Sequence, residues 1–161
     1  MPEHKLLLGT EDAWSSVDGK KLWSRPGGSP FVHGAIVVAN QWDPKTRTNT
    51  LLGLDPRTGT ERWRHKGLFS RHSPQRGQTM RPDAPLIAKV NGDGAKLVRI
   101  DPGTGRTGPV LTLPEKHLPE TYCVGDLVFA VCADRGVDPK GGTPPDKRRW
   151  YALEPAQFGE A

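Results

Sequence analysis

The chain has 161 residues, among them 19 Gly and 16 Pro, with a formal net charge of +5. This length suits one ordinary domain, and so much Gly and Pro argues against long helices. The small basic excess is ordinary for a protein surface and does not by itself indicate an acidic partner. No apolar run reaches the ~18 residues that a membrane helix needs, and no signal-peptide pattern opens the chain. The chain as written is therefore predicted to be soluble and cytoplasmic, but its location stays open.

The first predicted hairpin lies near the start of the chain. Residues 14–19 end in Asp18-Gly19, a dipeptide typical of a two-residue type I′ turn. Four residues after Gly19 stands Trp23, which we expect in the following strand. Asp18, Gly19 and Trp23 are therefore predicted to be structural positions of a first repeat.

The second repeat is the most complete. Residues 31–39 are apolar and rich in β-branched side chains, which predicts inner strands buried on both faces. Residues 51–59 predict a strand that ends in a turn, where Asp55 accepts hydrogen bonds from backbone N–H groups and Gly59 takes a positive φ. Trp63 follows Gly59 by four residues, the same spacing as in the first repeat.

Two further copies follow. Residues 97–105 align on the second repeat without a gap and share its Asp-Pro-x-Thr-Gly ending, with Asp101 and Gly105 at the turn positions. Pro109 stands where the earlier repeats have Trp, a departure that we expect to weaken that strand. Residues 150–155 form a weaker fourth copy that ends in Glu-Pro. The recurring Trp positions predict packing between neighbouring repeats.

Each repeat thus predicts four antiparallel strands, with two apolar inner strands, one strand entering the turn and one outer strand. Four short strands in every 40–50 residues are typical of a propeller blade, whereas a sandwich or Greek-key barrel has no need of a repeat. We therefore expect an all-β propeller segment of about three and a half repeats, incomplete or part of a larger ring. The repeats span residues 5–29, 30–67, 84–114 and 119–161.

The pattern Leu-x-Leu-Asp-x-x-Thr-Gly-x-x-x-Trp in residues 52–63 resembles the repeat of PQQ-like β-propellers. That superfamily includes quinoprotein dehydrogenases, a bacterial outer-membrane assembly lipoprotein and sensor domains of bacterial kinases, and its members are often exported. The resemblance covers nearly the whole chain and is closest in the second repeat. Because the family contains both enzymes and non-enzymes, the resemblance implies a fold rather than an activity.

Three long segments are the candidate binding region. Residues 40–49 and 133–149 are predicted loops between second and third strands, and the basic segment 67–84 is a predicted link between repeats. The alternating strand directions would place all three on one face, where long loops commonly bind partners. The alternative is a solvated loop surface without a partner. The predicted face comprises Trp42, Lys45, Arg47, Phe69, Arg71, His72, Arg76, Arg81, Lys147, Arg148 and Arg149.

No complete catalytic or metal-binding set is evident in the sequence. The five histidines lack HExxH spacing, and residues 91–94 predict a hairpin turn rather than a calcium loop. The resemblance raises the question of PQQ, which quinoprotein dehydrogenases bind with calcium and a catalytic Asp, many of them beside a disulfide between adjacent cysteines. Cys123 and Cys132 are nine residues apart, and we expect them on opposite faces of one strand without a disulfide. We predict no cofactor, and the cysteines leave the compartment open.

The leading prediction is a non-catalytic PQQ-like propeller module that serves as a binding or scaffold surface for a protein partner. Self-association that completes the propeller stays open as a second kind of partner. One alternative is a fragment of a PQQ-dependent quinoprotein oxidoreductase. Another is binding of nucleic acid or another polyanion by the basic loops, with Trp42 or Phe69 available for stacking.

Overall fold

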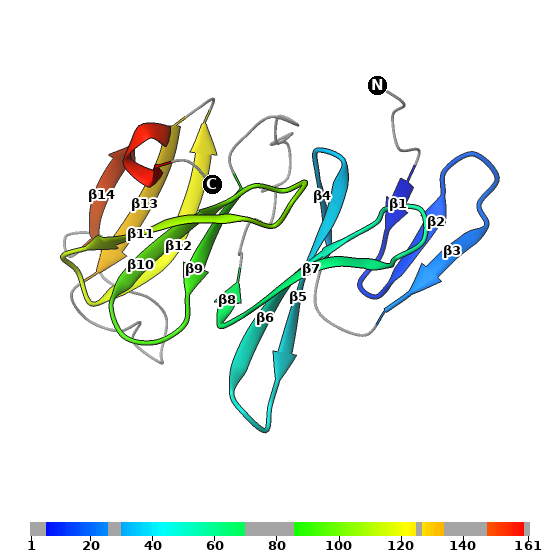
Figure 1. Cartoon of the computed structure of the whole chain (residues 1–161), viewed down its shortest axis with the longest axis horizontal. Coiled ribbons are helices and arrows are strands. Elements are labelled where there is room, and N and C mark those ends of the chain that lie inside the picture. Colours follow the sequence, from blue (N-terminus) through cyan, green and yellow to red (C-terminus); the bar gives the residue numbers. More distant parts are fainter. Residues whose placement is uncertain (1–5, 26–29, 70–85, 125–126, 134–147, 160–161) are drawn as a thin grey trace. The chain divides into compact units, whose positions relative to one another are not determined.

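The computed structural model is all-β, and its described residues form four antiparallel sheets of three or four strands and a short 3₁₀ helix (Figure 1). Within the described part of the chain, no helix is long and apolar enough to cross a membrane. The chain forms two compact units, Met1–Asp83 with Pro102–Gly105, and Ala84–Asp101 with Arg106–Ala161. The structure describes residues 6–25, 30–69, 86–124, 127–133 and 148–159.

The first sheet has three strands in the order β1-β2-β3, namely β1 (Leu6–Leu8), β2 (Asp12–Ser15) and β3 (Lys21–Ser24). The predicted two-residue turn at Asp18-Gly19 is wrong, because the turn begins at Ser15. The Ser15 amide donates to the Lys20 carbonyl at 2.8 Å, and the Gly19 amide donates to the Ser15 carbonyl at 2.9 Å. Asp18 therefore lies inside a longer turn rather than at its start.

The second sheet contains the predicted four antiparallel strands in chain order. These are β4 (Phe31–His33), β5 (Ile36–Asp43), β6 (Thr48–Leu54) and β7 (Glu61–Lys66). The prediction that this region has an inner strand buried on both faces is confirmed for β5, since Ile36, Val37 and Val38 are all at most 1% exposed. Trp63 lies on the outer strand β7 as predicted and is buried.

The turn between β6 and β7 has the predicted hydrogen bonds. Asp55 Oδ1 accepts from the amides of Arg57 at 3.0 Å and Thr58 at 3.1 Å, and Gly59 has a φ of +68°. The Asp55 amide donates to the Thr60 carbonyl, just as the Ser15 amide donates to that of Lys20. Ser15 thus corresponds to Asp55, and Asp18 corresponds to Thr58 rather than to the turn-opening Asp.

Residues 40–49 were predicted as a long loop, and this prediction is wrong. Strand β5 continues to Asp43 and β6 starts at Thr48, with Trp42 paired to Asn49 in the register. Only four residues connect the strands, because the pairing of β5 with β6 continues to Asp43 and Thr48, beyond the buried part of the sheet. The result is a hairpin with a short tip.

The remaining strands form two sheets in the orders β11-β10-β9-β8 and β12-β13-β14, and β9 to β14 belong to the second unit. Residues 68–69, predicted within a link between repeats, form the short strand β8. The turn after Ile100 follows the Asp55 pattern, with the Asp101 amide donating to the Arg106 carbonyl at 2.8 Å. The elements are β8 (Leu68–Phe69), β9 (Leu86–Val90), β10 (Ala95–Ile100), β11 (Thr107–Leu113), β12 (His117–Val124), β13 (Leu127–Ala133), β14 (Arg148–Leu153) and η2 (Pro155–Phe158).

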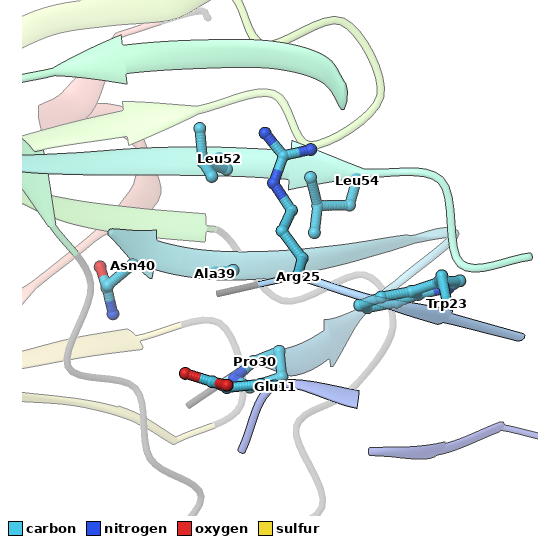
Figure 2. A pocket seen from close by; sticks show the side chains of 8 residues that line it. All are labelled: Glu11, Trp23, Arg25, Pro30, Ala39, Asn40, Leu52 and Leu54. Carbon is cyan, nitrogen blue, oxygen red and sulfur yellow. The ribbon is translucent and has the colours of Figure 1, made fainter. Parts of the chain in front are cut away.

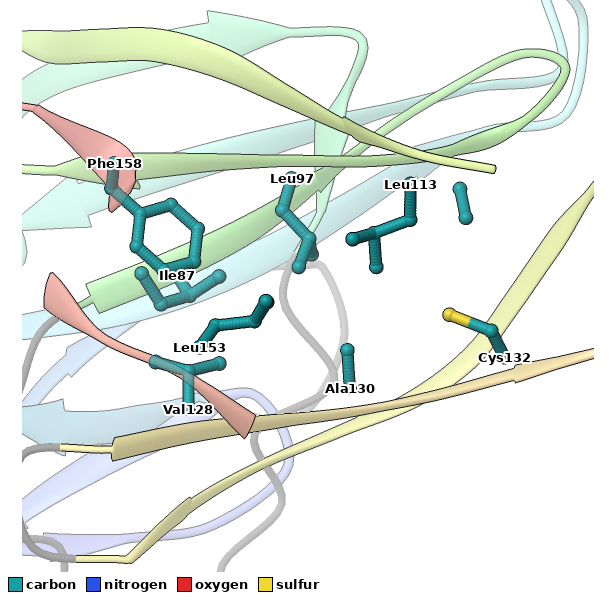
Figure 3. Close-up of a cluster of buried hydrophobic side chains, with 9 residues drawn as sticks. Ile87, Leu97, Leu113, Val128, Ala130, Cys132, Leu153 and Phe158 are labelled. Atoms are coloured by element: carbon teal, nitrogen blue, oxygen red, sulfur yellow. The ribbon is translucent and has the colours of Figure 1, made fainter. Parts of the chain in front are cut away.

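Each unit has an apolar core between two sheets. In the first unit, Leu6, Leu8 and Trp23 of the first sheet pack against the second sheet, whose buried residues there include Val37 and Leu54. In the second unit, side chains from β9–β11 face those from β13 and β14, and Phe158 of η2 closes one end (Figure 3). The hydrophobic effect of these stacked faces is the main stabilising contribution in both units.

The two cysteines lie on neighbouring strands rather than on one strand. Cys123 belongs to β12 and Cys132 to β13. Cys132 is a buried free thiol in the core of the second unit, and burial raises its pKa to about 11, with the nearby Glu115 carboxylate adding to the increase. A thiol with so high a pKa is unreactive at neutral pH.

Candidate functional site

The tip of the β5–β6 hairpin carries three residues of the predicted binding face. Trp42 is 53% exposed, and Lys45 and Arg47 are exposed in the turn that follows. Asp43 fixes that turn, because its Oδ1 accepts from the Lys45 amide at 2.9 Å and its Oδ2 accepts from the Thr46 hydroxyl at 2.8 Å. These bonds, that of Thr46 first, lower the pKa of Asp43, so an ionised carboxylate holds the tip in shape.

This tip repeats the turn that joins β6 to β7. Residues 43–48 read Asp-Pro-Lys-Thr-Arg-Thr, and residues 55–60 read Asp-Pro-Arg-Thr-Gly-Thr. In both turns the opening Asp accepts from the amides two and three residues later. This second copy was not predicted, although the twelve-residue spacing of Asp-Pro-x-Thr-x-Thr is a signal that could have revealed it.

Arg47 occupies the glycine position of this turn. Its φ is +51°, whereas Gly19, Gly59 and Gly105 fill the corresponding position of the other three turns with φ between +68° and +75°. A side chain in the left-handed region costs about 1 kcal/mol or more, which is why glycine is usual there. Backbone strain of this kind tends to persist where a side chain has a function.

The remaining residues of the predicted face lie elsewhere or are not described. Phe69 is half-buried in β8, and Arg148 and Arg149 are exposed on β14 in the second unit. Arg149 donates to Glu115 Oε1 at 3.2 Å, so part of its charge is compensated. Arg71, His72, Arg76, Arg81 and Lys147 lie outside the described residues. The single shared face thus stays a prediction.

The recurring tryptophans bind the turn of another sheet. Trp23 Nε1 donates to the Pro56 carbonyl at 2.9 Å, and Trp63 Nε1 donates to the Pro102 carbonyl at the same distance. Each ring also covers the turn glycine so closely that a Cβ on Gly59 or Gly105 would lie within 2.7 Å of it. These bonds and close contacts support the predicted packing role of the tryptophans.

A second pair of contacts accompanies the tryptophans. Two residues after Trp23, Arg25 reaches the Gly59 carbonyl at 3.4 Å and pairs with Glu61 at 2.7 Å. Two residues after Trp63, His65 Nε2 lies 2.7 Å from the Gly105 carbonyl. The outer strand therefore holds the neighbouring turn at two places, which explains why these turns have a fixed geometry.

A small pocket lies beside Trp23 in the first unit (Figure 2). Its free volume is about 10 Å³, which is room for about one water molecule. A cofactor or drug-sized ligand needs several hundred cubic ångströms, so this pocket does not fit a quinone cofactor. Its lining consists of Glu11, Trp23, Arg25, Pro30, Ala39, Asn40, Leu52 and Leu54.

A buried polar cluster in the second unit was missed by the sequence analysis. Glu115 is 2% exposed, and its Oε1 accepts from Arg149 and from the Tyr151 hydroxyl. Its Oε2 has no hydrogen-bond partner in the described structure. The carboxylate also raises the pKa of the Tyr151 hydroxyl through their hydrogen bond. We interpret the cluster as a structural network that ties β14 to the loop before β12.

Among the described residues, no group of three or more His, Cys, Asp or Glu side chains is placed to hold a metal ion. Comparison with models of known protein families, and with curated proteins, finds no match to this chain. The hairpin tip with Trp42, Lys45 and Arg47 is consequently the best-defined candidate site.

Proposed function

We propose that this chain is a non-catalytic, PQQ-like β-propeller module that binds a protein partner through the β5–β6 hairpin tip. Support for the propeller comes from the repeated turn and from the tryptophans that join one sheet to the turn of another. Antiparallel sheets stacked face to face through their apolar residues, as in each unit, are the arrangement of neighbouring propeller blades.

The observation that carries the binding role is Arg47. Its turn has the same bonds as the turn at residues 55–60, so glycine would be the more stable choice. The strained arginine stands beside exposed Lys45 and Trp42 at a projecting hairpin tip. Trp and Arg are the side chains enriched in the energetic centre of protein interfaces, and a basic tip favours an acidic partner surface.

The experiment compares immobilised wild-type chain with Arg47→Gly, Lys45→Glu and Arg57→Glu in affinity capture from a cell extract, quantified by mass spectrometry. Arg57 is the matched control because it occupies the position of Lys45 in the other turn and is also exposed. We expect Arg47→Gly to unfold at higher urea, with a gain of about 1 kcal/mol, yet to capture its partner at least tenfold less well.

Loss of the same protein from Arg47→Gly and Lys45→Glu, with retention by Arg57→Glu, would support the proposal. Capture that survives both tip variants would contradict it. Capture that disappears after nuclease treatment and falls steeply with salt would instead identify the polyanion alternative, because counterion release gives that dependence.

A further inference from the structure

The sheets at the two ends of the chain can be compared with the complete second sheet, strand by strand. Because Ser15, Asp55 and Asp101 open equivalent turns, strands β2, β6 and β10 correspond to one another. Strand β14 ends just before Glu154-Pro155 and takes the same place in the fourth copy. The sheet β1-β2-β3 therefore corresponds to β5-β6-β7, and the sheet β12-β13-β14 corresponds to β4-β5-β6.

Both described cores join two different kinds of sheet face. In the first unit, the face of β1–β3 with Leu6, Leu8 and Trp23 packs on the face of β4–β7 with Val37 and Leu54. We call the former kind the leading face and the latter the trailing face. In the second unit, the leading face of β9–β11 packs on the trailing face of β13 and β14 (Figure 3).

The sheet β1–β3 has a trailing face of its own, and it is exposed. Leu7 pairs with Trp14 in the register as Val37 pairs with Leu54 and Val128 pairs with Leu153. Leu7 is 57% exposed, whereas Val37 and Val128 are both fully buried. A position that is apolar and buried in two sheets is thus apolar and uncovered in the first sheet.

The sheet β12–β14 exposes the opposite kind of face. Trp150 stands four residues before Glu154, as Leu51 stands before Asp55 and Leu97 before Asp101. Trp150 is 62% exposed, whereas Leu51 and Leu97 are fully buried. Its ring stacks on Tyr122 with centroids 6.2 Å apart and an angle of 16° between the ring planes, which extends the apolar surface of this leading face.

We propose that the leading face of β12–β14 binds the trailing face of β1–β3 in a second copy of this chain, forming a head-to-tail interface. The choice of occupant follows from complementarity: leading faces pack on trailing faces in both described cores, and one chain exposes one of each. Large exposed apolar side chains at positions that are elsewhere buried are typical of such an interface. The proposal rests on the repeat architecture of the proposed function but not on the hairpin tip.

The test measures the solution mass of the full chain by light scattering over a hundredfold range of concentration. We expect the wild type to rise to at least twice the 17.6-kDa chain mass. Trp150→Glu and Leu7→Glu should each stay at the mass of one chain, because each variant places a charge on one face. Val17→Glu is the matched control, since that valine is 70% exposed in the turn after β2 and lies on neither face.

Mixing the two variants gives the decisive result. Each retains one intact face, so Trp150→Glu and Leu7→Glu together should form a heterodimer that neither forms alone. A wild type that stays at one chain mass would overturn the proposal, as would an equal loss in Val17→Glu. A Leu7→Glu variant that still dimerises while Trp150→Glu does not would overturn it in favour of a symmetric contact between two β12–β14 sheets. Circular dichroism of every variant confirms that the sheets are folded, and tip-dependent capture tests the proposed function separately.

Discussion

The two units differ in the side chain that covers a glycine of positive φ in another element. In the first unit Trp23 and Trp63 lie over Gly59 and Gly105, and each indole N–H donates to a proline carbonyl. In the second unit Pro109 takes the place of the tryptophan and lies 2.9 Å from the position that a Cβ on Gly159 would occupy. Proline keeps the steric contact but cannot donate a hydrogen bond.

The difference shows two ways in which an outer strand contacts a glycine of another element. The first unit has tryptophan contacts to two turns beside a cluster of buried side chains that includes Val37, Ala39, Leu52 and Leu54. In the second unit the fully buried Phe158, just before Gly159, belongs to the cluster between the sheets, so apolar burial accompanies the proline contact there. Pro109 is tolerated because β11 is an edge strand, where a missing N–H leaves no partner unsatisfied.

The largest expected effect is that of Trp63→Ala. This side chain is 8% exposed and loses both its packing and its bond to Pro102, so we expect a loss of about 4 kcal/mol in the free energy of unfolding. Pro109→Ala, at the equivalent but exposed position, should cost less than about 1 kcal/mol. Urea unfolding followed by circular dichroism measures both. Equal losses would mean that the tryptophan contact is not what distinguishes the two units.

The turn glycines allow a sharper comparison between backbone strain and close packing. Gly19 and Gly105 have nearly the same φ, but a Cβ on Gly19 meets nothing within 4 Å, whereas one on Gly105 would lie 2.5 Å from Trp63. We expect Gly19→Ala to cost about 1 kcal/mol from strain alone, and Gly105→Ala about 3 kcal/mol because the ring must also move.

The same urea titration tests this pair. A cost for Gly19→Ala as large as that for Gly105→Ala would show that φ alone decides and that the tryptophan yields easily. Gly105→Ala combined with Trp63→Phe provides a further check, because a smaller ring should recover part of the loss if the clash is its source.

The sequence predicted the parts of the fold that depend on local chemistry. Asp55 and Gly59 specify their turn through an acceptor at its start and a positive φ at its end, and both are legible in the residues themselves. The first turn was predicted wrongly because a serine hydroxyl, that of Ser15, accepts the hydrogen bond at its start instead of an aspartate carboxylate. The dipeptide Asp18-Gly19 indicated a two-residue turn at the wrong place. Local patterns do not reveal which of two acceptors the backbone selects.

The candidate site was predicted only in part for a related reason. Trp42, Lys45 and Arg47 were identified from composition, but their turn was predicted as a loop. The turn motif was not recognised because Arg47 stands where the motif usually has glycine. Glu115 was missed because its burial depends on Arg149 and Tyr151, which lie more than 30 residues later in the chain. Burial that depends on tertiary packing leaves no periodic signal around the residue itself.

The smallest expected effect is a difference between the two Asp-Pro-x-Thr turns in how their contribution to the free energy of unfolding depends on pH. Arg62, and then the amides of Arg57 and Thr58, lower the pKa of Asp55 from 3.8 to about 2. A carboxyl whose pKa is lower in the folded state stabilises the protein above about pH 4, and that contribution is lost as the pH falls through 2. Because Arg62 is 43% exposed and solvent screens the pair, we expect about 1 kcal/mol.

Asp55→Asn should remove this acid-sensitive contribution, so the difference in unfolding free energy between pH 5 and pH 2 becomes smaller than in the wild type. Asp43→Asn is the control, because the pKa of Asp43 is also lowered but chiefly by the Thr46 hydroxyl, with no arginine bonded to the carboxylate among its causes. We expect Asp43→Asn to change the pH dependence less. An equal change in both variants would show that the turn amides and hydroxyl, which the two motifs share, stabilise the carboxylate and that Arg62 adds little.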